Sequence, residues 1–294
     1  MTRALVVGEA LVDVIDGVAR PGGSPVNVAV GLSRLGLDVT MATRIGDDAH
    51  GRQLDEHLRC SGVRLTSDSR TNAPTSTARV RLDSAGAAHY EFDIDWDIER
   101  PPVDDVDLVH IGSIGAYLEP GASTVEDIVS DAHTRSRLVS FDPNIRPRLV
   151  GGRAAAARRT ERLASKSHIV KLSDEDAAWL FPGTPLDAVL RRLRTLGARV
   201  VIATRGSRGC CALAGDQILE LPAPEADVVD TVGAGDAFMS GFLAAVMADG
   251  GARRIVLGAA PVRGWSEALE TGLRSAALTV ARQGADPPWL SELR

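Results

Sequence analysis

Short apolar runs alternate along this chain with longer segments in which apolar residues recur every three or four positions. The short runs predict buried strands, and the 3.6-residue recurrence predicts helices with one face toward a core. The predicted strands cover residues 5–7, 39–42, 108–111, 138–141, 169–170 and 200–203. The predicted helices cover residues 25–35, 51–60, 122–134, 153–164, 174–181 and 186–196. Gly36 and Gly197 follow two of these helices, where a C-terminal glycine cap is expected.

The interleaving of strands and helices predicts the fold class. Strands that are apolar along their whole length belong in a mostly parallel sheet with helices on both faces, which gives an α/β protein of three αβα layers. With 294 residues, of which 44% are hydrophobic, the chain can bury a large core as one domain or as two smaller ones. We find no repeat of fixed period and no low-complexity linker.

Residues 75–99 break this rhythm. Along residues 75–82, one set of side chains alternates with another: Thr75, Thr77, Arg79 and Arg81 with Ser76, Ala78, Val80 and Leu82. Ser84 to Gly86 then predicts a turn, and the alternation resumes at His89. This pattern is typical of an antiparallel hairpin inserted into an α/β domain. Such a hairpin is either an ordinary sheet edge or a lid over a site, and the pattern alone supports both interpretations.

Composition and charge exclude several classes of function. The net charge of −6 disfavours a nucleic-acid partner. Neither lysine, Lys166 or Lys171, follows a glycine, which excludes the Walker A phosphate loop, and the His-Arg-Asp and Asp-Phe-Gly triplets of protein kinases do not occur. Three cysteines without Cys-x-x-Cys spacing argue against a disulfide framework or a zinc site, so we expect a reducing, cytoplasmic location. No apolar run reaches the roughly 18–20 residues of a membrane span, and the N-terminus does not resemble a signal peptide.

Polar residues follow several predicted strands at the point where each strand ends. Asp13 trails the first strand, Asp142 and Asn144 follow the fourth, Ser173 follows the fifth, and Thr204 follows the sixth. In open α/β sheets, ligands bind at the carboxyl ends of the strands. These positions therefore predict one shared cleft.

Residues 230–238, Asp-Thr-Val-Gly-Ala-Gly-Asp-Ala-Phe, carry the most specific chemical signal. Gly233, Ala234 and Gly235 form a loop that opens an apolar helix, and the unpaired N–H groups of a helix N-terminus attract phosphate. Asp236 places a carboxylate in the same first turn, where it would repel phosphate unless it takes a proton from an attacking hydroxyl. The alternative is that Asp236 only complements the helix dipole.

A second glycine segment lies near the N-terminus. Gly22 and Gly23 permit a tight turn and the close approach of a ligand, and Asn27 offers a donor and an acceptor that suit a polyol hydroxyl. The alternative is a plain loop with Ser24 as the helix N-cap and Pro25 at the first helical position.

Together these segments resemble the ribokinase-like (PfkB) family of carbohydrate kinases. The resemblance is carried by Gly22-Gly23-x-x-x-Asn27-x-Ala29 and by Asp230-Thr-x-Gly-Ala-Gly-Asp236, and it runs almost from end to end. Segments 8–13, 44–51, 142–146 and 204–209 also look like family segments. Segments 73–75, 112–113, 118–121 and 171–176 look most like fructokinases.

The resemblance implies one ribokinase-like αβα domain over residues 1–294, with a small β lid formed by insertions at about 12–22 and 73–100. It implies ATP and Mg²⁺ as cofactors, K⁺ as a candidate monovalent cation, and a small-molecule sugar as the other substrate. It implies no nucleic-acid or membrane partner, and it raises a homodimer as an assembly to test.

The resemblance also implies roles for the matching positions, with Asp236 as the base that deprotonates the acceptor hydroxyl. The residues implied in catalysis are Asp236, Gly233, Ala234, Gly235 and Arg146, of which the last four contact the phosphoryl group. The implied sugar contacts are Asp13, Gly22, Gly23 and Asn27. The implied nucleotide-side residues are Lys171, Ser173, Thr204, Gly206, Gly209 and Thr231. The implied metal-site residues are Asp142, Asn144 and Asp176 for Mg²⁺ through water, and Asp230 for the monovalent cation.

Two segments depart from the family pattern. Many relatives carry Asn-x-x-Glu where this chain has Ser173 and Asp176, a pair that also spells an N-terminal capping box. Only eight residues separate Asp13 from Gly22, where relatives often place a strand pair of the lid, and this short segment predicts a smaller lid.

The expected reaction is transfer of the γ-phosphoryl group of ATP to a sugar hydroxyl, with fructose, giving fructose 6-phosphate, as the leading acceptor. Ribose, 2-keto-3-deoxygluconate and a nucleoside are alternative acceptors, although two tyrosines and five phenylalanines disfavour an aromatic sandwich around a base. A non-catalytic sugar or nucleotide sensor on the same fold is disfavoured by Asp236. An NAD-dependent oxidoreductase is disfavoured because no Gly-x-Gly-x-x-Gly follows the first predicted strand.

Overall fold

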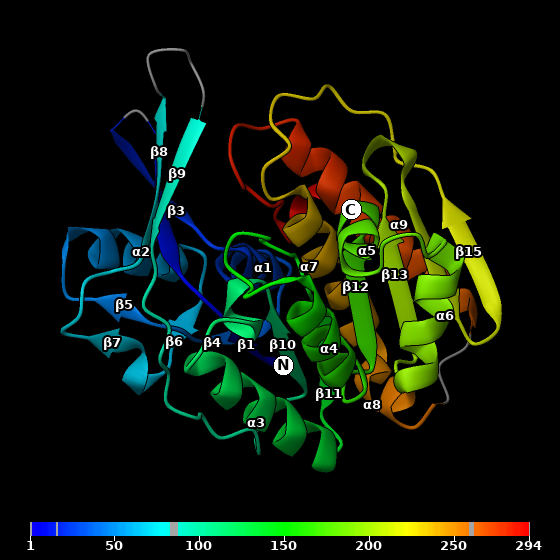
Figure 1. The fold of residues 1–294 in the computed structure, drawn as a ribbon. Coiled ribbons are helices and arrows are strands. Elements are labelled where there is room, and N and C mark those ends of the chain that lie inside the picture. Colours follow the sequence, from blue (N-terminus) through cyan, green and yellow to red (C-terminus); the bar gives the residue numbers. More distant parts are fainter. Residues whose placement is uncertain (1, 16, 83–87, 259–261, 294) are drawn as a thin grey trace.

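A nine-stranded sheet forms the centre of the protein. The computed structural model describes residues 2–15, 17–82, 88–258 and 262–293 (Figure 1). In spatial order the strands of this sheet are β15 (Gln217–Leu221), β14 (Cys210–Ala214), β13 (Val200–Thr204), β12 (Ile169–Ser173), β11 (Leu138–Asp142), β10 (Leu108–Gly112), β1 (Arg3–Val7), β4 (Asp38–Ala42) and β6 (Arg64–Leu65). The strands from β6 to β13 are parallel, and β14 and β15 extend the sheet in antiparallel pairing.

Helices cover both faces of this sheet, and Figure 1 shows them around it. On one face lie α1 (Ser24–Arg34), α2 (Ala49–Cys60), α7 (Ala234–Met247), α8 (Gly251–Val256) and α9 (Val262–Val280). On the other lie α3 (Gly121–Thr134), α4 (Arg153–Ala164), α5 (Asp174–Leu180) and α6 (Leu186–Leu196). Within the described ranges, no helix combines the length and the apolar character needed to cross a bilayer.

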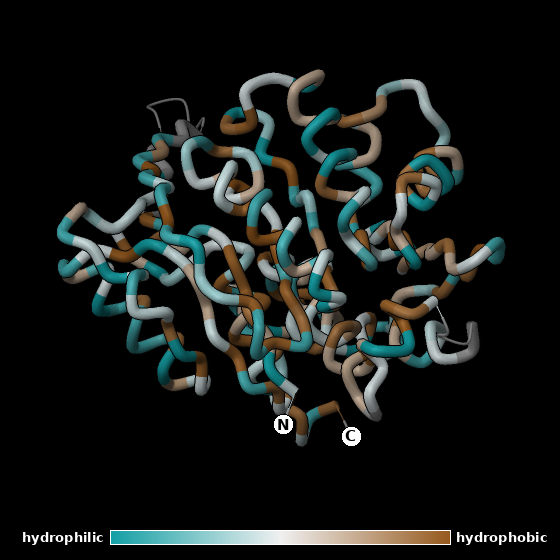
Figure 2. The backbone as a smooth tube through the Cα atoms, turned by 90° about the horizontal axis from the view of Figure 1, so that it is seen from below, coloured by the Kyte–Doolittle hydropathy of each residue, from teal (hydrophilic) through white to brown (hydrophobic). Residues whose placement is uncertain are grey.

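Successive residues of the central strands belong to opposite core layers. In β1, Ala4 and Val6 pack with the helices of one face, whereas Leu5 and Val7 pack with those of the other. This two-sided burial explains why the parallel strands are apolar along their whole length. Figure 2 shows the hydrophobic segments gathered toward the middle of the molecule.

A second, four-stranded sheet stands at one side of the main sheet. It consists of β3 (Val18–Gly22), β2 (Leu11–Ile15), β8 (Thr77–Leu82) and β9 (Ala88–Asp93), in that order. The strands β8 and β9 pair antiparallel, so the predicted hairpin is present, and its predicted turn at 84–86 lies outside the described residues. A further small pair joins β5 (Ile45–Gly46) to β7 (Arg70–Thr71).

The short segment between Asp13 and Gly22 belongs to this second sheet. It contains most of the antiparallel pair β2–β3, in which Asp13 lies directly opposite Arg20. The short segment still forms a strand pair because β2 begins at Leu11, before Asp13, and β3 ends at Gly22, so the pair also uses residues outside the eight that separate Asp13 from Gly22. Asp13 itself lies inside β2 rather than in the loop after the first strand.

The predicted three-layer α/β architecture is confirmed, and each predicted strand and helix overlaps an observed one. The sequence patterns did not predict β2, β3, β14, β15, α8 or α9, nor the two-residue strands β5, β6 and β7, of which β6 lies at the other end of the main sheet. Because β14 and β15 lie at one end of the sheet, and β2 and β3 in the second sheet, these omissions leave the parallel centre unchanged.

Candidate active site

The N-terminus of α7 holds a buried carboxylate. Asp236 lies in the first turn of α7 and is 6% exposed. Its Oδ1 accepts a hydrogen bond from the Ser24 hydroxyl at 2.6 Å, and its Oδ2 accepts one from the Asn27 amide at 2.8 Å. Both donors lie on α1, which therefore fixes the orientation of the carboxylate.

These bonds change the interpretation of two α1 residues. Gly23, not Ser24, is the N-cap of α1, and no side chain caps this helix. The alternative in which Ser24 serves as the N-cap was wrong because the hydroxyl donates to Asp236 instead. Asn27, predicted as a sugar contact, directs its amide nitrogen to the same carboxylate, which leaves its oxygen as the atom available to a ligand.

The turn before Asp236 presents backbone N–H groups. Gly233 is the N-cap of α7 with φ +76°, and a Cβ there would come within 2.5 Å of the Cβ of Ala285, so only glycine fits. Ala234 donates its N–H to the carbonyl of Thr231 at 3.3 Å. Within the described ranges, the N–H groups of Gly235 and Asp236 form no hydrogen bond, so they remain available to an anion.

A buried ion pair lies beside this turn. Lys171 Nζ and Asp142 Oδ2 are 2.7 Å apart, with side chains that are 5% and 1% exposed. A Cβ on Gly235 would lie 3.0 Å from Lys171 Nζ, which places the ammonium directly against the α7 N-terminus. The second oxygen of Asp142, Oδ1, is buried and has no hydrogen-bond partner in the part of the chain that is described.

Both members of this pair have shifted pKa values. Burial opposes the charged form of Lys171, but the carboxylates of Asp142, Asp236 and Asp176 outweigh it and raise the pKa of the ammonium. Burial also raises the pKa of Asp142 to about 6, although Lys171 acts in the opposite direction. The pair is therefore ionic at neutral pH and places a fixed positive charge near Asp236.

Ser173 and Asp176 form the capping box of α5. Asp176 N–H donates to Ser173 Oγ at 2.9 Å, and Ser173 N–H donates to Asp176 Oδ2 at 3.0 Å. The other oxygen of Asp176 accepts the Ile145 N–H at 2.9 Å. The capping interpretation is thus confirmed, and Asp176 also ties the start of α5 to the loop after β11.

That loop carries Asn144 and Arg146. Asn144 has a left-handed φ of +37°, and its Oδ1 accepts a hydrogen bond from Arg146 Nη1 at 2.8 Å. Arg146 is exposed, and its charge lowers the pKa values of Glu9 and Asp13 against the dominant effect of burial. The loop therefore places a cation near the carboxylates at the edge of the second sheet.

Asp13 and the glycine pair meet at that edge. A Cβ on Gly22 would lie 2.3 Å from Asp13 Oδ2, so glycine is needed to make room for the carboxylate. Burial raises the pKa of Asp13. Gly23 is also needed as a glycine, because a Cβ there would lie 2.7 Å from the backbone carbonyl oxygen of Glu9.

Glu9 is a site residue that the sequence analysis did not assign. It directly follows the strand-end Gly8, is 1% exposed, and accepts hydrogen bonds from the Gly115 N–H at 2.8 Å and from the Ser113 side chain. Burial raises its pKa to about 7. The sequence did hold a signal for Glu9, which is an acidic residue just after a central strand. The same signal had identified Asp142.

The remaining predicted residues lie at the ends of β13 and before α7. Thr204 ends β13, Gly206 begins a 3₁₀ turn, and a Cβ on Gly209 would lie 2.0 Å from the Leu221 carbonyl oxygen. Asp230 accepts N–H groups of Val232 at 3.0 Å and Gly284 at 2.9 Å, and these backbone bonds lower its pKa. The Thr231 carbonyl accepts the Ala234 N–H. No hydrogen bond between described residues joins Thr204, Gly206 or Gly209 to the cluster around Asp236.

Comparison with known proteins gives a consistent result. The model of the pfkB family of carbohydrate kinases matches residues 1–292. A fructokinase from Rhizobium leguminosarum bv. trifolii is 34% identical over 261 residues, which cover 83% of this chain and 80% of that protein.

Solved structures extend this similarity to the fold. The structure of a fructokinase from Xylella fastidiosa with bound ATP has a TM-score of 0.84 and 27% identity, covering 99% of this chain and 96% of that one. An aminoimidazole riboside kinase from Salmonella enterica, in complex with aminoimidazole riboside and an ATP analogue, has a TM-score of 0.83. Its identity is 24%, with 99% of this chain and 98% of that chain covered, so it shows a shared fold.

The buried carboxyl of Glu9 makes stability depend on pH. Its pKa is raised by burial from 4.5 to about 7, so its contribution to stability is present at low pH and is lost as the pH rises through about 7. Glu9→Gln cannot ionise. We expect the free energy of unfolding of the wild type, relative to this variant, to fall by up to about 3 kcal/mol between pH 5 and pH 8.

Chemical denaturation across this pH range measures the difference. Glu267→Gln, at an exposed position on α9, is the matched control and should leave the pH dependence of the wild type unchanged. A constant difference between the wild type and Glu9→Gln at all pH values would contradict the assignment of this titration to Glu9.

Proposed function

The chain belongs to the pfkB family of carbohydrate kinases, and we propose that it transfers the γ-phosphoryl group of ATP to a hydroxyl of fructose, giving fructose 6-phosphate. Membership of the family makes it an ATP-dependent sugar kinase. The choice of fructose is supported by the Rhizobium relative and by the Xylella structure, both of which are fructokinases.

One observation carries the proposed chemistry: the buried Asp236 carboxylate lies in the same helical turn as unpaired N–H groups. A sugar hydroxyl in hydrogen-bond reach of Asp236 loses its proton to the carboxylate as its oxygen attacks the γ-phosphorus. Ser24 and Asn27 each donate to one oxygen and hold the carboxylate in a fixed plane. Each carboxylate oxygen keeps a lone pair for the substrate.

The protein groups around the proposed position of the phosphoryl group carry positive charge or partial positive charge. In phosphoryl transfer, catalysis comes mainly from positioning and from stabilising charge on the transferred oxygens. The N–H groups of Gly235 and Asp236 and the ammonium of Lys171 lie together at the α7 N-terminus. We assign Gly233, Ala234 and Gly235 to the turn that shapes this anion hole, with Arg146 as a further phosphate contact.

The sugar is proposed to lie between this turn and the second sheet. Asp13, Gly22 and Gly23 form one edge of that space, and the free oxygen of Asn27 forms another. Adjacent sugar hydroxyls suit carboxylate and amide acceptors. The nucleotide is proposed to extend toward Thr204, Gly206, Gly209 and Thr231, with Ser173 acting through the α5 cap.

The residues present fit Mg²⁺ held through water. Asp142 Oδ1 is a buried oxygen without a partner among the described residues, whereas Asn144 and Asp176 already accept hydrogen bonds. No group of three or more acidic, histidine or cysteine side chains within the described ranges could hold a metal directly. When bound, Mg²⁺ neutralises negative charge on the ATP phosphates. Asp230, beside Gly284, is the proposed K⁺ residue.

We also propose a cytoplasmic location and a homodimer that forms through the second sheet. The three cysteines are free, which suits a reducing compartment. The complete β2–β3 pair, with Val18 at 55% exposure, supplies an apolar contact for a second copy.

A coupled ADP-release assay tests the acceptor. We expect fructose to give the highest kcat/KM among fructose, ribose, 2-keto-3-deoxygluconate, adenosine and aminoimidazole riboside. A nucleoside as the best acceptor would replace the fructose proposal and keep the kinase chemistry. No turnover with any acceptor would favour a sensor on the same fold.

Removal of the proposed base tests the mechanism. Asp236→Asn keeps the size of the side chain: its Oδ1 can still accept from the Asn27 amide and its Nδ2 can donate to the Ser24 hydroxyl oxygen, but the amide does not accept the proton. We expect kcat to fall by at least about 10²-fold, with ATP affinity changed only a few-fold. The matched control is Asp187→Asn, an exposed carboxylate in the first turn of α6, which should retain full turnover. Near-normal kcat in Asp236→Asn would remove Asp236 from the role of base.

Removal of the proposed sugar contact tests the second sheet. Asp13→Ala deletes a carboxylate at the sugar edge, so we expect the KM for the sugar to rise far more than the KM for ATP. Asp93→Ala is the matched control, because Asp93 is exposed on the same sheet but on its other face. An equal rise of both KM values in Asp13→Ala would indicate general loss of the site instead.

A further inference from the structure

Arg20 extends from the second sheet on the same side as Asp13. The two residues are direct cross-strand partners in the antiparallel pair β2–β3, so their side chains share one face of the sheet. Gly22, two positions along β3, is on that face as well, and Asp13 Oδ2 occupies the space above it. Arg20 is exposed. Arg20 is therefore anchored beside the proposed sugar edge, on the strand that pairs with Asp13.

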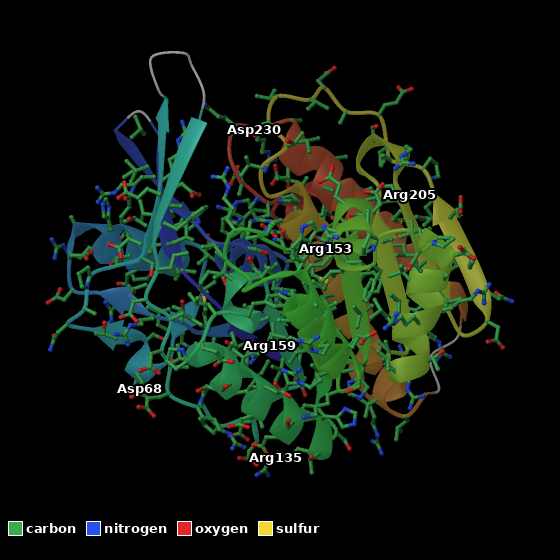
Figure 3. All side chains as sticks on the ribbon, in the orientation of Figure 1. Asp68, Arg135, Arg153, Arg159, Arg205 and Asp230 are labelled. Carbon is green, nitrogen blue, oxygen red and sulfur yellow. The ribbon has the colours of Figure 1, made fainter. Side chains whose placement is uncertain are left out.

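The guanidinium of Arg20 also reaches the opposite side of the site. Its Nη1 lies 3.9 Å from the position that a Cβ on Gly284 would take. Its charge lowers the pKa of Asp230, and in Figure 3 Asp230 lies at the same end of the molecule as the second sheet. Ala285, the next residue after Gly284, packs against Gly233, the N-cap of α7. Arg20 thus lies near both the second sheet and the turn that supports the anion hole.

Arg20 has no internal partner in the described part of the chain. No ion pair or hydrogen bond of its side chain is present there. Asp230 lies nearby and accepts the N–H groups of Val232 and Gly284, but no hydrogen bond or ion pair joins it to Arg20 within the described ranges. A guanidinium with five donors is therefore held near the site with its donors unused.

We propose that Arg20 is a further catalytic residue, which donates hydrogen bonds from the second sheet to the phosphoryl group during its transfer. This inference rests on the proposed function. The sugar oxygen forms a bond to the γ-phosphorus, the bond to the β–γ bridging oxygen breaks, the electron pair leaves with ADP, and the proton goes to Asp236. Arg20 exchanges no proton and contacts only phosphoryl oxygens.

Geometry and charge favour a phosphoryl group over a sugar hydroxyl as the ligand of Arg20. The planar guanidinium fork matches two phosphoryl oxygens, whereas a neutral hydroxyl offers no charge to pair. Lys171 and the α7 N–H groups act on the phosphoryl group from the main sheet. Arg20 would act from the second sheet, on the side where the sugar is proposed to lie.

Steady-state kinetics of Arg20→Ala, Arg20→Lys and Arg79→Ala test the proposal. Arg79 lies on β8 with its side chain on the other face of the second sheet, so Arg79→Ala is the matched control. We expect Arg20→Ala to lower kcat by about 10²-fold, with both KM values changed only a few-fold. Arg20→Lys should recover part of the loss because it restores charge without the fork. The control should match the wild type.

Binding of ADP with fluoroaluminate and fructose, a mimic of the phosphoryl group in transfer, gives a second readout. Arg20→Ala should bind this mimic about 10²-fold more weakly than the control while binding a non-hydrolysable ATP analogue equally well. Unchanged kcat and mimic binding, or a rise in the sugar KM alone, would overturn the role of Arg20. If the wild type phosphorylates no sugar, both this inference and the proposed function fail, whereas an active wild type with an equally active Arg20→Ala overturns this inference alone.

Discussion

The buried carboxylate of Asp236 joins two helices that are distant in the chain, and the arrangement of the site depends on it. Ser24 and Asn27 on α1 bind its two oxygens. Burying a carboxylate is costly unless hydrogen bonds and nearby positive charge compensate for the lost water. The α7 N-terminus and Lys171 supply the positive charge, and the two α1 donors supply the hydrogen bonds. Close packing of Gly31 against Ser240 keeps the helices together at their next turns.

A fixed ion pair beneath this carboxylate extends the same principle. Asp142 ends β11, Lys171 lies in the middle of the neighbouring parallel strand β12, and both are almost fully buried. Burial, followed by the charge of Lys171, lowers the pKa of His110 to about 3, so this neighbouring histidine remains neutral and pairs with Ser140 at 2.8 Å. The ion pair thus lies near the neutral His110, and its ammonium lies against the α7 N-terminus. A site of this kind is preorganised, because its charges are in place before a ligand arrives.

The structural features that have strong local sequence patterns were predicted from the sequence. The apolar strands, the amphipathic helices and the Gly-Ala-Gly-Asp turn each have a periodicity or a composition with one good structural solution. Ser24 was missed as a site residue because its partner is 212 positions away, and a local capping role explained it equally well. Glu9 was left without a role because a strand-end carboxyl reveals its burial only through Gly115 and Ser113, which follow a different strand. The strands β2 and β3 are short and mixed in character, so their own pattern did not identify them; β2 pairs with β3 on one side and with β8, more than 60 residues later in the chain, on the other.

The central claim is that Asp236 takes a proton from a sugar hydroxyl beside the α7 N-terminus. A crystal structure of the protein with fructose and a non-hydrolysable ATP analogue tests it most directly. We expect one fructose hydroxyl oxygen within hydrogen-bond distance of a carboxylate oxygen of Asp236, and the γ-phosphate against the N–H groups of Gly235 and Asp236. A ternary complex in which Asp236 still contacts only Ser24 and Asn27, with the sugar hydroxyls and the γ-phosphate bound elsewhere, would contradict it.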